Sequence, residues 1–213
     1  MLAGKKPPQL QMLMIGPGGT SKTVVINEIT HMFAVLGAND MLSKTATSGV
    51  ATTLISGTTL HYWAALPMII CQKDGWIEKP SKKMKDRREK NILPCNYLIL
   101  DEASMATTEV FEATSSIAGF VKNGSSDPAQ GFGGINVILV RDFHQFPPPG
   151  HENLALFNRK QVTNSAILSH AIFEQFETVV ILKEQMRIWD AQWMIILKHA
   201  QNGDCTADDI AEI

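Results

Sequence analysis

The 213-residue chain has few cysteines and no long apolar run, and each absence excludes a class of protein. Cys71, Cys95 and Cys205 lie far apart, which fits neither a disulfide framework nor the spacing of a zinc site. The simplest interpretation is a reducing, intracellular compartment. No apolar run approaches the roughly 18 residues that cross a bilayer, so we expect no membrane partner. No apolar stretch precedes Pro7 and Pro8, so we expect no secretory signal.

The chain has no large excess of either charge. It contains 19 Lys and Arg and 21 Asp and Glu, which give a formal net charge of −2 at pH 7. This balance excludes a strongly basic nucleic-acid tail and an acidic disordered segment, but not a local basic surface. The segment Lys73–Lys90 has eight Lys or Arg against four Asp or Glu. A solvated helix face and a basic binding surface both remain open for it.

Short apolar runs alternate with helical patterns, which predicts one α/β domain with a mostly parallel sheet. The predicted strands are Gln11–Ile15, Leu42–Ala46, Tyr97–Leu100, Ile135–Val140 and Thr178–Leu182. The predicted helices are Lys22–Leu36, Ser48–Leu66 with a break at Gly57, Val110–Val121, and Ala191–Ala200 closed by Asn202 and Gly203. The apolar run Ile135–Val140 suits a strand buried on both faces. Gly119–Gly134 is rich in glycine and serine and is predicted to be a mobile loop.

The strongest functional signal lies between the first strand and the first helix, and reads Gly16-Pro17-Gly18-Gly19-Thr20-Ser21-Lys22-Thr23. Such a turn points several backbone N–H groups at one anion, and the helix N-terminus adds positive partial charge. Lys22 is predicted to reach the β- and γ-phosphates of a nucleotide, and Thr23 to bind Mg²⁺. The alternative is a glycine-rich loop without a ligand.

One position in this loop departs from the phosphate-binding pattern. The residue before the lysine is normally glycine, and here it is Ser21. We expect the Cβ of Ser21 to crowd either the turn or the phosphate oxygens.

Two acids follow the apolar strand Tyr97–Leu100. Asp101 is predicted to hold Mg²⁺ through water, and Glu102 to orient or deprotonate an attacking water. The alternative is an ordinary acid pair at the start of a helix near Ser104. Together with the glycine-rich loop, the acid pair becomes a specific signal.

Five segments, in order, resemble the motifs of the Pif-type DNA helicases, superfamily-one motors that move 5′ to 3′ on single-stranded DNA. The segments are Gly16–Thr23, Ala46–Ala64, Leu98–Met105, Gly133–Pro148 and Leu182–Arg187. Five matches in family order are far more specific than any one of them. The resemblance implies a three-layer, RecA-like P-loop NTPase fold, ATP and Mg²⁺ as cofactors, and single-stranded DNA as a partner.

The resemblance also implies roles for single residues. Gln145 matches the glutamine that senses the γ-phosphate, and Arg187 matches an arginine that contacts phosphate. Thr59 and His61 fall in the stretch that contacts DNA in the family. Because His61 lies beside Tyr62 and Trp63, packing in the core is the favoured alternative for this histidine.

The resemblance covers residues 1–213 as one RecA-like domain and ends where a second should begin. Translocation requires that second domain, in a longer chain or in trans. Relatives carry a small strand-separating insert at the position of residues 67–95, so the basic segment there is a candidate contact to backbone phosphates. By family analogy we expect roles in DNA repair, recombination and telomere maintenance, and localisation to the nucleus or mitochondrion.

Two other functions remain open. The chain would be a helicase remnant that binds nucleotide or DNA weakly without turnover if the altered positions have removed activity. These positions are Ser21 and Arg141, which stands where the family has glycine before Asp142. An unrelated P-loop kinase is the other candidate, but it leaves the segments around Gln145 and Arg187 unexplained.

Overall fold

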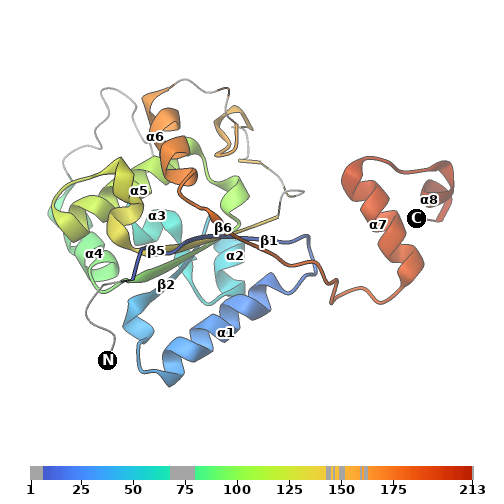
Figure 1. Ribbon diagram of the computed structural model, residues 1–213, viewed down its shortest axis with the longest axis horizontal. Helices are drawn as coiled ribbons and strands as arrows, with labels where there is room; N and C mark the ends of the chain where they lie inside the picture. The colour runs from blue at the N-terminus through green and yellow to red at the C-terminus, as the bar shows by residue number, and fades with distance from the viewer. Residues whose placement is uncertain are drawn as a thin grey trace.

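The computed structural model describes residues 7–67, 80–142, 145, 147–148, 152–158, 160 and 163–212. Its centre is a six-stranded sheet with the order β3-β2-β4-β5-β1-β6 (Figure 1). The strands are β1 (Gln11–Ile15), β2 (Leu42–Ala46), β3 (Thr58–Thr59), β4 (Tyr97–Asp101), β5 (Asn136–Arg141) and β6 (Thr178–Ile181). Every neighbouring pair is parallel, so the carboxyl ends of the strands meet at one edge.

The α-helices are α1 (Lys22–Val35), α2 (Gly49–Leu54), α3 (Leu60–Trp63), α4 (Lys82–Ile92), α5 (Thr108–Asn123), α6 (Asn164–Phe173), α7 (Ala191–Asn202) and α8 (Ala207–Glu212). Short 3-10 turns cover Asn39–Met41, Ala103–Met105, Pro128–Gly134 and Glu152–Leu154. No helix in the described ranges is long and apolar enough to span a membrane.

Two apolar cores lie on the two faces of the sheet and make the fold three-layered. Alternate strand residues face opposite sides, so Leu13 packs with α3, α5 and α6, whereas the next residue, Met14, packs with α1 and α2. Ile99 and Ile138 belong to the same core as Met14. The predicted α/β fold of RecA-like type is confirmed, and its buried central strands explain the continuous apolar runs.

The region predicted to be helical from Ser48 to Leu66 contains a strand as well. The break at Gly57 is confirmed, because a Cβ there would lie 2.5 Å from the carbonyl oxygen of Lys44. The chain therefore passes directly beside β2, and β3 pairs with Thr45 and Ala46. The hydroxyl of Thr59 then accepts a hydrogen bond from the Tyr62 N–H (3.2 Å) and caps α3.

The prediction of a mobile loop from Gly119 to Gly134 is wrong at both ends, and only residues 124–127 form a loop. Gly119 lies inside α5, and the later part forms a packed 3-10 turn. Phe132 is only 1% exposed, and its N–H donates to the hydroxyl of Ser115 at 2.8 Å. Its ring meets that of Phe111 edge-on, with centroids 5.2 Å apart. One buried aromatic ring fixes a segment whose glycine content predicts mobility.

Helix α4 occupies the described part of the basic segment, and residues 68–79 lie outside the described ranges. Most of its charged side chains are exposed, as a solvated helix face requires, but Arg88 is buried. Arg88 donates to the carbonyls of Ala64 and Ala65 at 3.1 Å each, just after the end of α3. Arg88 therefore stabilises the packing of α4 against the end of α3.

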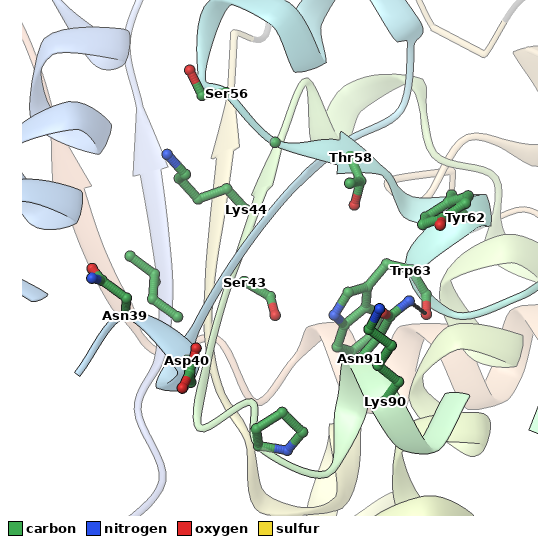
Figure 2. Close-up of a pocket in the computed structure, with 13 residues that line it drawn as sticks. Asn39, Asp40, Ser43, Lys44, Ser56, Thr58, Tyr62, Trp63, Lys90 and Asn91 are labelled. Carbon is green, nitrogen blue, oxygen red and sulfur yellow. Dashed lines mark hydrogen bonds between the residues drawn. The ribbon is translucent and has the colours of Figure 1, made fainter. Parts of the chain in front are cut away.

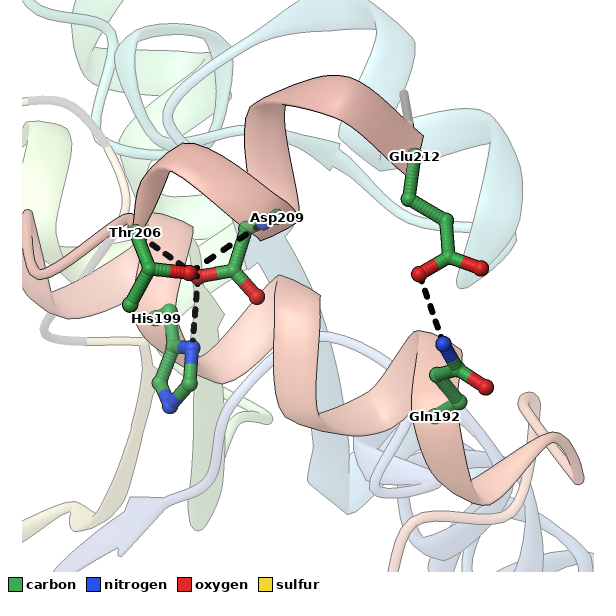
Figure 3. A network of polar contacts seen from close by, with 5 residues as sticks. All are labelled: Gln192, His199, Thr206, Asp209 and Glu212. Atoms are coloured by element: carbon green, nitrogen blue, oxygen red, sulfur yellow. Dashed lines mark hydrogen bonds and ion pairs between the residues drawn. The ribbon is translucent and has the colours of Figure 1, made fainter.

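Helices α7 and α8 stand apart from the sheet at the end of an extended segment (Figure 1). Thr206 and Asp209 form a capping box at the start of α8, in which the Thr206 N–H donates to Asp209 Oδ2 at 2.7 Å (Figure 3). The same oxygen contacts His199 Nδ1 at 2.8 Å. Hydrogen bonds from Thr206 lower the pKa of Asp209. These contacts join the two helices into a hairpin, and Gly203 ends α7 as predicted.

Candidate functional site

A cleft of about 390 Å³ lies at the carboxyl ends of the central strands and collects residues from distant parts of the chain. Its lining contains Gly18, Gly19, Ser21, Lys22, Thr23, Val24, Leu54, Asp101, Glu102, Gln145, Met186 and Arg187. The structure therefore brings together the residues predicted to bind phosphate, metal and water. Of the predicted loop residues, Gly16 and Thr20 are buried behind this lining.

Lys22 and Thr20 hold the shape of the glycine-rich turn. The Lys22 ammonium donates to the carbonyls of Gly16 (2.7 Å) and Pro17 (3.1 Å). The Thr20 hydroxyl donates to Pro17 at 2.8 Å, and a Cβ on Gly16 would lie 2.4 Å from that hydroxyl. Gly16 and Thr20 therefore shape the turn from behind, and Lys22 lies where its charge faces the cleft.

Ser21 occupies a left-handed backbone conformation, with φ 64° and ψ 27°. A side chain in this region costs about 1–2 kcal/mol relative to glycine. Ser21 begins α1, but its hydroxyl caps no N–H group of the helix, so no hydrogen bond offsets the strain. The sequence predicts crowding at Ser21, and the structure places the cost in its backbone.

Asp101 and Glu102 share a site that disfavours negative charge. Asp101 ends β4, is 6% exposed, and accepts a hydrogen bond from the Glu102 N–H at 2.9 Å. Burial raises the pKa of Asp101, against the opposing effects of that N–H and of Lys22. Burial and the charges of Asp101 and Asp142 raise the pKa of Glu102. A carboxylate with a raised pKa is a better proton acceptor, which suits a general base.

Gln145 lies directly against Glu102. With its amide nitrogen turned toward the acid, Gln145 donates to both carboxylate oxygens of Glu102, at 3.2 Å for Oε1. The residue predicted to sense the γ-phosphate therefore contacts the residue predicted to activate water. A movement of one side chain changes the hydrogen bonding of the other.

The segment that carries Arg187 lies across the glycine-rich turn. Gln185 Nε2 donates to the carbonyl of Gly18 at 2.9 Å, and the Met186 N–H donates to that of Gly19, also at 2.9 Å. Gly19 has a left-handed backbone, with φ 86°, which favours glycine, and a Cβ there would also displace the amide of Gln185. Sequence reasoning did not assign Gln185, although it stands two residues before Arg187.

The donor set fits a magnesium–nucleotide complex. Within the described residues, no group of three or more His, Cys, Asp and Glu side chains could hold a metal by itself. Mg²⁺ prefers six oxygen ligands and usually keeps several waters while binding one or two protein groups and the substrate phosphates. Thr23 and Asp101 line the cleft and could supply that number of protein oxygens, and Lys22 could supply the cation for the phosphates.

Comparison with known proteins identifies the family. The family model of the PIF1-like helicases matches residues 5–202. The chain belongs to the PIF1-like helicase family.

Two relatives show how much of such a helicase this chain represents. The chain is 27% identical over 197 residues to ATP-dependent DNA helicase RRM3 of Saccharomyces cerevisiae, covering 91% of this chain and 25% of the relative. It is 30% identical over 198 residues to ATP-dependent DNA helicase PIF1 of Xenopus laevis, covering 92% of this chain and 28% of the relative. The chain therefore spans about a quarter of the length of these relatives.

Solved structures of Pif1 helicases share the fold. The Candida albicans Pif1 structure aligns with a TM-score of 0.72 at 24% identity, covering 95% of this chain and 43% of that one. Bacteroides Pif1 in complex with ADP-AlF3 and single-stranded DNA aligns with a TM-score of 0.70 at 22% identity, covering 95% and 45%.

In this PIF1-like chain, Arg141 lies away from the cleft lining. Burial lowers the pKa of Arg141 to about 10, and its guanidinium lies 5.1 Å from the centre of the Phe157 ring. Its backbone carbonyl accepts the Gly16 N–H at 3.2 Å. The side chain of Arg141 therefore packs against Phe157 and does not line the cleft, and its backbone contacts the glycine-rich turn.

The predicted DNA-contact stretch borders a second cleft of about 230 Å³, lined by Thr47, Leu60, His61, Met105, Ala106, Thr107, Val110 and Pro148. His61 is exposed, so the favoured expectation that it packs in the core is wrong. Trp63 is 3% exposed and supplies that core contact instead. Thr59 does not line this cleft, and its hydroxyl caps α3.

Proposed function

We propose that this chain is the nucleotide-binding half of a Pif-type helicase that couples ATP hydrolysis to 5′–3′ unwinding of DNA. The observation that carries this proposal is the single cleft in which Lys22, Asp101, Glu102, Gln145 and Arg187 meet. Their arrangement matches the groups that phosphoryl transfer requires. These are a cation that binds the phosphates, an acidic residue that holds the metal, a base that activates water, and a residue that senses the γ-phosphate.

Each residue has a defined task in this proposal. Lys22 binds the β- and γ-phosphates of ATP, and Thr23 and Asp101 hold Mg²⁺, which supplies positive charge to the phosphates when bound. Glu102 accepts a proton from the attacking water, helped by its raised pKa. Gln145 holds the carboxylate of Glu102 in place, and Arg187 stabilises charge on the transferred group.

Single-stranded DNA is the proposed partner, at the cleft that His61 lines. Bacteroides Pif1 has been solved with single-stranded DNA and with ADP-AlF3, which supports both ligands for this fold. Unwinding needs a second RecA-like domain, and the short share of its relatives that this chain spans supports a longer protein or a partner in trans. Roles in repair, recombination and telomere maintenance follow from the same proposal.

Calorimetric titration with Mg·ADP tests the nucleotide site. We expect Lys22→Ala to weaken binding about 30-fold or more, because hydrogen bonds from a charged group contribute roughly 2 kcal/mol. Lys85→Ala on α4, outside the cleft, is the matched control and should bind as the unmodified chain does.

Two results would count against the proposal. Equal affinity of the Lys22→Ala variant would show that the glycine-rich turn is not the site. Absence of binding by the unmodified chain would show a helicase fold that has lost its nucleotide.

A further inference from the structure

A pocket of about 510 Å³ lies along the outer edge of β2 and shares no lining residue with the nucleotide cleft (Figure 2). Strand β3 covers only Thr45 and Ala46 of β2. Leu42 and Ser43 therefore pair with β4 on one side and, among the described residues, with no strand on the other, whereas Gly57 lies against the carbonyl of Lys44. An uncovered strand edge presents N–H and C=O groups to an incoming chain.

The pocket has the form of a groove with the strand edge as its floor. Ser43 and Lys44 are successive residues of β2, so their side chains point to opposite faces of the sheet (Figure 2). Trp63 and Asn91 form the wall on the side of Ser43, and Ser56 lies on the side of Lys44. This shape fits an extended peptide better than a compact ligand.

Trp63 offers a hydrogen-bond donor that the fold leaves unused. Its ring is 3% exposed, and its Nε1 has no hydrogen-bond partner. In Figure 2 this nitrogen faces the side of the pocket where Ser43 lies. The Asn91 amide holds the Trp63 carbonyl at 3.0 Å, so the residue is fixed in place. A buried donor without a partner costs free energy that an acceptor in the groove would recover.

The charged residues that line the groove favour an anionic acceptor for the Trp63 indole N–H. Lys44 and Lys90 line it against a single acid, Asp40. Arg87 lies just beyond, with its guanidinium 4.5 Å from the centre of the Tyr62 ring. Partial burial lowers the pKa of Lys44, and an anion beside its ammonium would offset that cost. The groove therefore favours a carboxylate over a cationic side chain.

We propose that the edge of β2 binds an extended segment of a partner protein that carries an acidic side chain. The segment pairs with the open edge of β2 at Leu42 and Ser43 as an added strand, and its carboxylate accepts the Trp63 indole N–H on the face of the sheet where Lys90 lies. Main-chain hydrogen bonds provide the affinity in such a complex, and the side-chain pocket provides the specificity.

NMR titration of the full chain with the peptide Ac-Val-Glu-Val-Glu-Val-NH₂ tests this site directly. We expect shifts of the Trp63 indole resonance, which a Trp63→Phe variant assigns, and of the backbone amides of residues 42–44. The peptide Ac-Val-Lys-Val-Lys-Val-NH₂ should bind at least about fivefold more weakly.

Charge-reversal variants show whether the groove itself carries the binding. Lys90→Glu should weaken the acidic peptide about fivefold, because an attractive pair becomes repulsive, and Lys44→Glu, on the other face of the sheet, should weaken it less. Lys83→Glu makes the same change at an exposed position of α4 outside the groove and should leave the affinity unchanged.

Five outcomes would overturn the proposal. These are the absence of shifts at Trp63 and residues 42–44, equal binding of both peptides, and equal effects of Lys83→Glu and Lys90→Glu. The fourth is a tighter response of the same resonances to inorganic phosphate or to an oligothymidine, which would make the groove a phosphate site. Shifts that depend on protein concentration alone would assign the edge to a second copy of the chain.

Discussion

Ser21 has a backbone conformation that glycine adopts without strain, and it lines the proposed nucleotide cleft. We expect Ser21→Gly to tighten Mg·ADP binding about three- to tenfold, measured by calorimetry, because the Cβ and hydroxyl no longer crowd the turn. Thermal stability should change little, because the relief of about 1–2 kcal/mol of left-handed strain is offset by the greater freedom of glycine in the unfolded chain.

Ser56 provides the matched control, because it is also a left-handed serine, with φ 49°. It lies outside the nucleotide cleft, so Ser56→Gly should leave the affinity for Mg·ADP unchanged. An unaltered affinity in the Ser21→Gly variant would show that this serine is no obstacle to the nucleotide.

The raised pKa of Asp101 should make the stability of the fold depend on pH. Burial raises its folded-state pKa, so its contribution to stability is fully present below the unfolded pKa of about 3.9 and is lost as pH rises through the folded value. At neutral pH the charged carboxylate therefore destabilises the fold. We expect Asp101→Asn to raise the melting temperature by about 2–4 °C at pH 7, as for a gain of roughly 1 kcal/mol, and to give no gain near pH 4.

Thermal melts of the Asp101→Asn variant and the unmodified chain, compared at each pH, measure this difference. Asp86→Asn, an exposed position on α4, should show no gain at either pH. A variant that is less stable than the unmodified chain at pH 7 would contradict the sign given for Asp101.

Helix α4 is held to the domain by its buried arginine. Arg88→Ala removes the donors to the carbonyls of Ala64 and Ala65 and the packing of the arginine stem. We expect a loss of about 2–3 kcal/mol in the free energy of unfolding, measured by urea denaturation. Lys85→Ala, exposed on the same helix, should stay within about 0.5 kcal/mol of the unmodified chain. Equal losses in the two variants would remove this role from Arg88.

The elements that the sequence predicts well are those with a pattern of their own. The five predicted strands are confirmed to within a residue at each end. The apolar runs of β4 and β5 are buried between helices, whereas β6 is exposed and is indicated by its β-branched residues. Strand β3 has only two residues and exists through its pairing with β2. Helix α6 was not predicted, because its buried side chains are Ala166, Ser169 and Ile172, while Ile167 is 56% exposed. Its apolar periodicity is therefore weak.

The residues of the candidate site also differ in how well the sequence predicts them. Lys22, Asp101 and Glu102 can be predicted, because their chemistry depends on local spacing after a strand. Gln185 cannot be predicted from local sequence, because it contacts Gly18, which lies 167 residues earlier in the chain. His61 was misassigned to the core because a local apolar pattern does not tell which of three neighbouring rings faces inward.

At the scale of the whole molecule, the chain is one RecA-like domain followed by a separate helical hairpin (Figure 1). Large apolar side chains are exposed around the hairpin, with Trp189 at 83%, Ile210 at 66% and Ile195 at 54%. A surface of this kind is typical of an interface. Such a surface fits a contact with the second domain that the proposed function requires.

Thr47 connects the two clefts of the domain. It lines the cleft that contains His61, and its hydroxyl donates to the backbone carbonyl of Glu102 at 3.1 Å. Glu102 in turn lines the nucleotide cleft. If single-stranded DNA binds beside His61, a shift of Thr47 reaches the proposed base through one hydrogen bond. We therefore expect this contact to carry coupling between DNA and nucleotide.

Thr47→Val keeps the shape of the side chain and removes the hydroxyl. We expect the ratio of Mg·ADP affinities with and without an oligothymidine to fall toward 1 in this variant, while the affinity for nucleotide alone changes less than about twofold. Because coupling is reciprocal, Mg·ADP should lose its effect on DNA affinity by the same factor. Thr53→Val, an exposed position on α2, should keep the coupling of the unmodified chain. Full coupling in the Thr47→Val variant would show that the two clefts communicate by another route.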